Sequence, residues 1–380
     1  MNTMNKQLLL KFLPAFSFVA TVGTLVGFAV DRVSGRAISN FQFFKQGLMP
    51  DGIHYEVRTL RFLGKIDSEI LASITAQYKH TGLLVTDYFL NPDSWEAALV
   101  DPRLLFSLLS VVFVKFIGLT GFFVVPMACF AFLSLSPLLF NARHLGSNQK
   151  ALSFGLALIL LGSFYANFNI LANTTDGLSA LLVVLLVMLL IKNFSYKASK
   201  WDLILIPFIC LLACMTRQNE IYVVGLVAIF SLNKYKKSRT TAIFIALISA
   251  IVVFSWLVFS FMRYKNYAII TDSSGQSLGG TSLLSDLFGL VIKLPQTVLI
   301  EFFQLLIRDV GVFAILSIAI LLVFPLREIT LTQQLFLWVL LSGIFLTSVN
   351  GSLGSGFRYA LPSIYIGAFS ILEYWNEKNV

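Results

Sequence analysis

Long apolar runs separated by short polar connections are the feature that most constrains the fold of this 380-residue chain. A helix needs about 20 apolar residues to cross the hydrocarbon core of a bilayer. Only 12% of the residues are charged, whereas a soluble domain averages about 25%. We therefore predict an all-α polytopic membrane protein, with residues 1–380 forming one transmembrane domain of about ten helices. The predicted spans are 8–30, 119–140, 151–168, 178–191, 203–215, 221–232, 241–262, 310–326, 331–349 and 359–373.

The charge pattern predicts how these spans are oriented. The net charge is +9, and much of the excess lies in short connections, at Lys150, in segment 192–200 and in segment 234–239. Ten spans with both termini in the cytoplasm put all of these connections on the cytoplasmic side, where basic residues are favoured. The charge thus serves orientation, so no nucleic-acid partner is expected. The composition indicates a bacterial inner (cytoplasmic) membrane.

Several function classes are excluded or disfavoured by what the sequence lacks. Cys129, Cys210 and Cys214 all lie inside apolar runs, where they are expected to be small core residues and not disulfide partners or metal ligands. The chain has no P-loop, no dinucleotide-type glycine fingerprint and no HExxH motif, which argues against a nucleotide-driven pump and an intramembrane zinc protease. No cofactor and no metal site are predicted, and a divalent metal requirement has no support.

Two segments are too long and polar to be ordinary connections, and both are expected on the non-cytoplasmic side. Residues 31–117 form the first, with helical spacing in 70–78 and again in 95–117. Helix 95–117 is expected to lie in the membrane interface and not to span it, because 119–140 is long enough alone. Residues 263–308 form the second long loop. Connections of this length are often functional.

The start of the first loop gathers the best candidates for catalysis. Asp51, between a proline and a glycine, is the candidate general base, although a carboxylate in that setting is also ordinary turn chemistry. His54 and Glu56 are further catalytic candidates and Tyr55 is a substrate-binding candidate, with ordinary loop residues as the alternative. Other carboxylates in the loop could take the role of Asp51; these are Asp67, Glu69, Asp87, Asp93, Glu96 and Asp101.

A second group of substrate-binding candidates lies at the outer ends of predicted spans. Arg217 and Glu220 lie between two runs of only about 12–13 residues, roughly 18–20 Å long, so their turn is expected below the outer membrane surface. Ionisable groups at that depth are functional candidates by default. Asp176 is another candidate, or simply the start of a helix. Arg358, followed by Tyr359, comes after a glycine-rich run. Arginines here suit a phosphate, although snorkelling to the interface is the plainer alternative.

The ordered layout of these features resembles the C-type integral-membrane glycosyltransferase superfamily. Four segments carry the resemblance: 51–55 (Asp-Gly-Ile-His-Tyr), 143–146 (Arg-His-Leu-Gly), 212–220 around Arg217, and 358–362 (Arg-Tyr-Ala-Leu-Pro). The resemblance covers most of the chain, but each motif is short, no paired acidic motif is clear, and no large C-terminal soluble domain follows. It implies that Asp51 is the catalytic base and that Arg217 and Arg358 hold the phosphate of a polyprenyl-phosphate sugar.

The expected function is an inverting hexosyl or pentosyl transfer at the non-cytoplasmic face, contributing to a cell-envelope glycan. The donor is a polyprenyl-phosphate-linked sugar, and the acceptor is a glycan, a lipid or a protein. A transporter or flippase for lipid-linked saccharides is the alternative from another class, although no internal repeat or paired broken helices support it. A polymerase of lipid-linked saccharides is a third option, which the loop 263–308 keeps open.

Overall fold

The computed structural model describes residues 50–78, 86–91, 103–140, 147–163, 166, 169–170, 174–195, 200–235, 238–264, 283–323, 329–349 and 358–379. Within these ranges the protein is all-helical and contains no strand. The all-α class predicted from the sequence is therefore confirmed for the part of the chain described. The predicted first span, 8–30, lies outside these residues.

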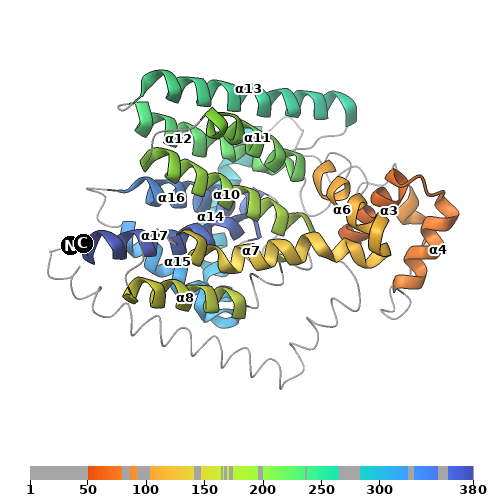
Figure 1. The fold of residues 1–380 in the computed structure, drawn as a ribbon, viewed down its shortest axis with the longest axis horizontal. Coiled ribbons are helices and arrows are strands. Elements are labelled where there is room, and N and C mark those ends of the chain that lie inside the picture. The colour runs from red at the N-terminus through yellow and green to blue at the C-terminus, as the bar shows by residue number, and fades with distance from the viewer. Residues whose placement is uncertain are drawn as a thin grey trace.

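The nine other predicted spans each correspond to a helix, and these helices form one bundle of roughly parallel and antiparallel rods (Figure 1). Their bounds are α7 (Val124–Phe140), α8 (Ser147–Gly162), α10 (Thr174–Ser195), α11 (Lys200–Thr216), α12 (Val223–Tyr235), α13 (Arg239–Tyr264), α15 (Val310–Val323), α16 (Leu331–Val349) and α17 (Leu361–Asn379).

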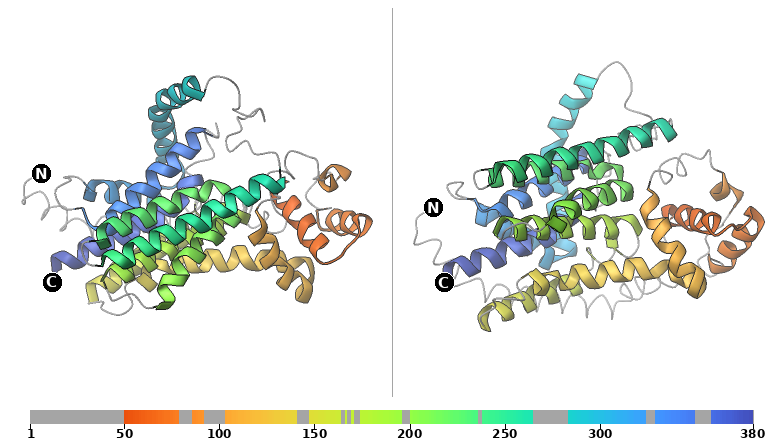
Figure 2. Two further views of the ribbon diagram at one scale, coloured as in Figure 1. Left: turned by 90° about the horizontal axis from the view of Figure 1, so that it is seen from above. Right: turned by 45° about the horizontal axis from the view of Figure 1, so that its top comes forward.

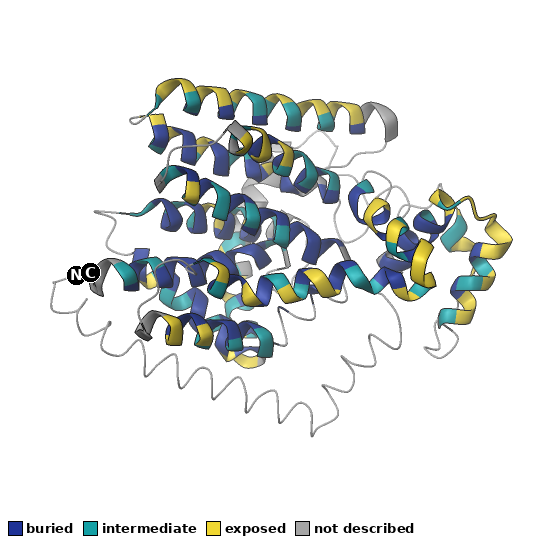
Figure 3. Ribbon diagram, viewed as in Figure 1, coloured by how far each residue is buried: buried dark blue, intermediate teal, exposed yellow. Residues whose placement is uncertain are grey.

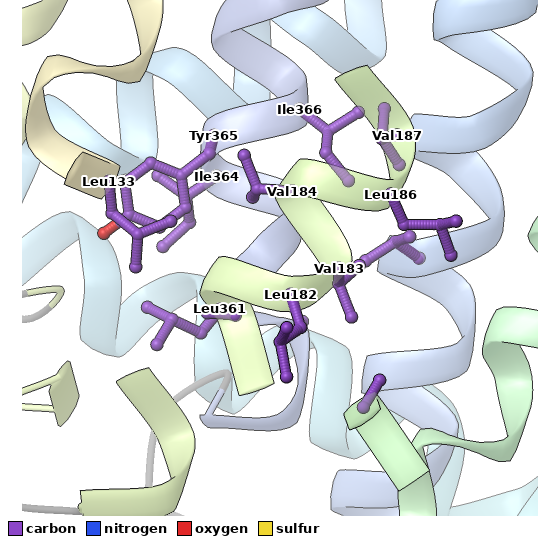
Figure 4. Packing of buried hydrophobic residues seen from close by; sticks show 14 of the residues in the cluster. Leu133, Leu182, Val183, Val184, Leu186, Val187, Leu361, Ile364, Tyr365 and Ile366 are labelled. Atoms are coloured by element: carbon purple, nitrogen blue, oxygen red, sulfur yellow. The ribbon is translucent and has the colours of Figure 1, made fainter. Parts of the chain in front are cut away.

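Helices α10 and α17 form the centre of the bundle. The stretch 361–372 of α17 is buried without interruption, as expected for a helix that is apolar on every face. Figure 4 shows Val184 and Val187 of α10 beside Ile364 and Ile366 of α17, and most of both helices is buried (Figure 3). The central position of α10 fixes where the polar residues at its first turn lie.

The outer helices present apolar side chains to their surroundings. On α13, Phe244, Leu247, Ile251, Phe254 and Val258 recur every three or four residues and are 48–61% exposed. Among the residues that the structure describes, three segments are long and apolar enough to cross a membrane, namely Leu104–Phe140, Thr175–Phe194 and Arg239–Ser260. Such lengths and compositions indicate that the protein associates with a membrane.

A separate group of short helices covers one end of the bundle (Figures 1 and 2). It consists of α3 (Pro50–Phe62), α4 (Asp67–Tyr78), the short 3-10 helices η1 (Asp87–Leu90) and η2 (Gly118–Phe123), and α6 (Leu104–Ile117). Helix α6 packs against α3 on one side and contacts α10 and α11 on the other. This end group thus connects the first long segment of the sequence to the ends of the bundle helices.

Glycines explain why α6 and α7 are two helices and not one. Gly118 has a φ of +68°, a conformation that glycine adopts without strain, and α6 ends there. A Cβ on Gly121 would lie 2.5 Å from the backbone of Phe113, so the chain folds back closely onto α6. The expected break between helix 95–117 and span 119–140 is therefore present, whereas the position of α6 in a membrane stays a prediction.

Two segments differ from the sequence analysis. Residues 50–62, expected as the loop that carries the catalytic candidates, form helix α3; Pro50 is at its first position, where a missing N–H costs nothing. The second half of the expected loop 263–308 is helix α14 (Leu283–Arg308). Polar residues such as Glu301 interrupt its apolar run, and Glu301 is buried while Phe303 is exposed. A helix that is apolar on only part of its surface gives no long apolar run in the sequence.

The basic residues of the short connections lie at the end of the bundle away from α3, called the basic end below. Lys150, Lys192, Lys234 and Arg239 lie at or near the ends of α8, α10, α12 and α13 there (Figure 1). Lys234 is buried and its Nζ donates to the carbonyl oxygen of Asn193 at 2.5 Å, at the C-terminus of α10. A cation at that position interacts favourably with the helix dipole and satisfies a carbonyl that has no partner within the helix. The opposite end also holds basic residues, in α3 and at the ends of α6.

Candidate functional site

The candidate site lies where α10 begins and α11 ends, at the end of the bundle that α6 contacts. Arg217 ends α11 because its backbone leaves the helix, with φ −150° and ψ 130°. Its Nη1 donates to Oδ1 of Asp176, in the first turn of α10. Both side chains are nearly inaccessible, 2% exposed each. The structure thus pairs two of the predicted site residues in a buried ion pair.

A second polar contact lies one turn further along both segments. A 3-10 turn, η3 (Gln218–Tyr222), follows Arg217, and the amide N–H of Glu220 donates to the carbonyl oxygen of Arg217 at 3.1 Å. Residues three apart share a face of such a turn, as they do on α10. The hydroxyl of Ser179 accordingly donates to Oε1 of Glu220. Ser179 was not singled out from the sequence; its spacing of three from Asp176 was the only signal.

Tyr359 closes the cluster from a third element. It lies in η4 (Arg358–Ala360), directly before α17, and its ring is 4.6 Å from the guanidinium carbon of Arg217. The backbone at η4 is fixed by close packing, since a Cβ on Gly343 of α16 would lie 2.4 Å from the Cα of Ala360. Tyr359, Arg217 and Asp176, all predicted site residues, therefore meet in one place although they are far apart in the sequence.

The cluster keeps unused hydrogen-bonding capacity. Nε of Arg217 is buried and has no hydrogen-bond partner in the part of the chain that is described. Buried polar atoms are almost always paired in proteins, so this N–H group calls for a partner such as water or a ligand. Glu220, by contrast, lies within hydrogen-bonding reach of both Ser179 and Tyr222. The structure leaves one donor available within the site.

The cluster holds charges of both signs, with one guanidinium near the carboxyl groups of Asp176 and Glu220. Burial raises the pKa of the Glu220 carboxyl above its ordinary value of 4.5, and the guanidinium of Arg217 and the hydroxyls of Ser179 and Tyr222 act in the opposite direction. Asp176 already compensates the charge of Arg217, so the direction of the guanidinium N–H groups matters for any anion that binds here.

The other predicted catalytic residues lie in α3. His54 is buried against η1, with its ring 5.2 Å from that of Phe89. The hydroxyl of Tyr55 accepts a hydrogen bond from Nη1 of Arg103 at 3.2 Å, and the Tyr55 ring packs on Phe106 of α6. Glu56 is fully buried in the same helix. The structure therefore gives Tyr55 a packing role between α3 and α6, and it places His54 against η1.

Two predicted residues are placed only by their backbone. Asp51 lies in the first turn of α3, and Arg358 begins η4 beside Tyr359; the side chains of both are outside the description. Helix α3 packs against α6, which contacts α10 and α11, and η4 lies directly before α17 (Figure 2).

The same end holds one buried polar pair that the sequence analysis did not find. Oδ2 of Asp309 accepts a hydrogen bond from the hydroxyl of Ser163 at 2.5 Å, and Oδ1 accepts the amide N–H of Val312 at 3.1 Å. Asp309 thereby caps α15, since it accepts a backbone N–H group of the first turn that has no partner within the helix. Both oxygens are occupied in this way, so we assign the pair to the stability of the helix ends.

A metal centre has no candidate in the described residues, where no three His, Cys, Asp or Glu side chains are grouped to hold an ion. Comparisons with protein-family models, curated proteins and solved structures return no match for this chain. The argument for function therefore depends on the residues and the geometry alone.

Proposed function

We propose that the protein is a membrane glycosyltransferase that moves a sugar from a polyprenyl-phosphate donor to an acceptor hydroxyl. The observation that carries the proposal is the buried Arg217, which is oriented by Asp176 and Tyr359 and retains an unpartnered Nε at one end of an apolar helix bundle. A lipid-linked anion needs an apolar groove for its tail and directional donors for its phosphate oxygens, and guanidinium is the side chain best suited to bind them.

The proposed reaction assigns one task to Asp51 and another to Arg217 and Arg358. A carboxylate, for which we propose Asp51, removes the proton of the acceptor hydroxyl. The acceptor oxygen then forms a bond to the anomeric carbon as the bond from that carbon to the phosphate oxygen breaks, which inverts the configuration. Polyprenyl phosphate leaves with the electron pair, and Arg217 and Arg358 stabilise its charge.

The proposed setting follows the charge pattern. About ten spans, with the first at 8–30, would put the basic end of the bundle in the cytoplasm and the end covered by α3 on the non-cytoplasmic face of a bacterial inner membrane. A lipid-linked donor delivered to that face needs no soluble nucleotide sugar. This agrees with the lack of nucleotide-binding motifs in the sequence.

A turnover assay with the purified protein tests the proposal. The protein in nanodiscs is incubated with a panel of radiolabelled polyprenyl-phosphate sugars, together with acceptor lipids and glycans from an envelope extract, and consumption of each donor is followed. We expect one donor to be consumed with release of polyprenyl phosphate. Saturable binding of a donor without consumption would instead favour a transporter or flippase, and neither binding nor consumption across the panel would refute the proposal.

A further inference from the structure

We propose that Tyr359 is a positioning residue that fixes the plane of the Arg217 guanidinium, so that its Nε edge points in one direction. Where the ligand is concerned, this inference rests on the proposed function. The geometric part concerns only Asp176, Arg217 and Tyr359, and it can be tested without any ligand.

One hydrogen bond cannot orient a guanidinium. The bond from Nη1 to Asp176 holds one corner of the group, but the plane can still tilt about the line that joins the two atoms. A ring over the face of the group removes this freedom, because the positive guanidinium is attracted to the negative face of the aromatic ring. Tyr359 supplies that ring at 4.6 Å from the guanidinium carbon.

The ring itself comes from a rigid backbone. Ala360, next to Tyr359, packs against Gly343 so closely that no side chain fits between them. The carbonyl oxygen of Ala360 also accepts the hydroxyl of Ser363 at 2.6 Å, which holds the start of α17. Three elements, α10, η4 and the end of α11, thus define the position of one guanidinium.

The fixed plane presents one edge of the guanidinium to a ligand. This edge contains Nε, and Nε is buried and has no hydrogen-bond partner among the described residues. The Nε–H group on this edge can donate to an oxyanion. Since Asp176 already compensates the charge of Arg217, the gain for a bound anion comes from the direction of this donor more than from net charge. An arginine that tilts freely would lose much of this gain.

The experiment measures the mobility of the Arg217 Nε–H group in the full-length protein in detergent micelles, with nitrogen-15 in the arginine side chains. The signal of Arg217 is assigned by its loss in Arg217→Lys. We expect a rigid Nε–H in the wild type and in Tyr359→Phe, which keeps the ring, and a mobile one in Tyr359→Leu. Equal rigidity in Tyr359→Leu would overturn the inference.

The conservative pair also separates positioning from general damage. The thermal unfolding temperature is recorded for both Tyr359 variants, and the comparison uses only preparations that unfold cooperatively. If Tyr359→Leu fails this standard, Tyr359→Met takes its place, since it fills a similar volume without an aromatic face. The same two outcomes apply to it: a mobile Nε–H supports the inference and a rigid one overturns it.

The consequence for the ligand is measured separately from turnover. With polyprenyl phosphate, which carries no sugar, we expect Tyr359→Leu to weaken binding about tenfold and Tyr359→Phe to leave it within about twofold. Wild-type affinity in Tyr359→Leu would contradict a positioning role. The proposed function fails on a different result, a lack of donor consumption in the wild type, which leaves the mobility measurement valid.

Discussion

At the scale of single residues, the site consists of buried ionisable groups, in which the carboxylate of Asp176 compensates the positive charge of Arg217. The sequence alone pointed to Asp176, Arg217 and Glu220, because ionisable residues between apolar runs are conspicuous and expensive. It could not predict which carboxylate pairs with Arg217, since the partner lies on another helix. Nor could it predict that the side chains of Tyr55 and His54, which are close to Asp51 in the sequence, pack between α3 and its neighbours α6 and η1.

The first prediction concerns the ion pair. Asp176→Ala leaves the guanidinium of Arg217 buried without its main counter-charge, so we expect a loss of about 3–5 kcal/mol in the free energy of unfolding. Denaturant titration in mild detergent measures this change. The control is Asp67→Ala, which breaks an exposed pair with Arg61 and should cost less than about 1 kcal/mol.

The double variant Asp176→Ala/Arg217→Ala sharpens this prediction. Because it removes both buried charges, it should be less destabilised than the sum of the two single variants. Strict additivity of the three measurements would argue that the pair contributes nothing to folding.

At the scale of elements, apolar runs of the right length predicted nine helices of the bundle and their approximate ends. Helix α3 was missed because Pro50, Asp51 and Gly52 are ordinary turn residues, whereas the proline in fact occupies the first helical position. Helix α14 was missed because polar residues such as Glu301, which is buried in the structure, interrupt the apolar run in the sequence. Both errors arise where packing between elements, and not local composition, decides the structure.

The second prediction concerns the contact that holds η4 in place. Gly343→Ala forces a Cβ to within 2.4 Å of backbone atoms of Ala360, which cannot move without displacing α17. We expect a loss of about 1–3 kcal/mol and reduced donor binding. Gly367→Ala is the matched control, because its Cβ meets only side chains, the nearest at 3.2 Å. Equal stability of the two variants would contradict the assigned role of this contact.

At the scale of the whole molecule, the two ends of the bundle differ in chemistry. One end carries Lys150, Lys192, Lys234 and Arg239, and the other carries the site and the group formed by α3, α4 and α6 (Figure 1). The sequence predicted that the basic connections share one end. The number of about ten membrane spans stays a prediction, since three segments among the described residues are long and apolar enough by themselves.

The third prediction tests which end faces the cytoplasm. Lys65→Cys places an exposed thiol after α3, and Lys150→Cys places one at the opposite end. In intact spheroplasts, a membrane-impermeant maleimide should label the first variant and not the second. The three natural cysteines are buried, so they should give little background. Labelling of Lys150→Cys alone would show that the orientation is the reverse of the one predicted.

The central claim is that Asp51 removes the proton of an acceptor hydroxyl that attacks a donor bound near Arg217. One comparison tests this claim most directly. Consumption of the donor identified in the panel is measured for the wild type, for Asp51→Asn and for Asp67→Asn, an exposed carboxylate on α4. We predict that Asp51→Asn loses activity roughly a hundredfold or more, as expected when a general base is removed, while it still binds the donor. Asp67→Asn should remain as active as the wild type. Full activity of Asp51→Asn, or an equal loss in both variants, would contradict the account.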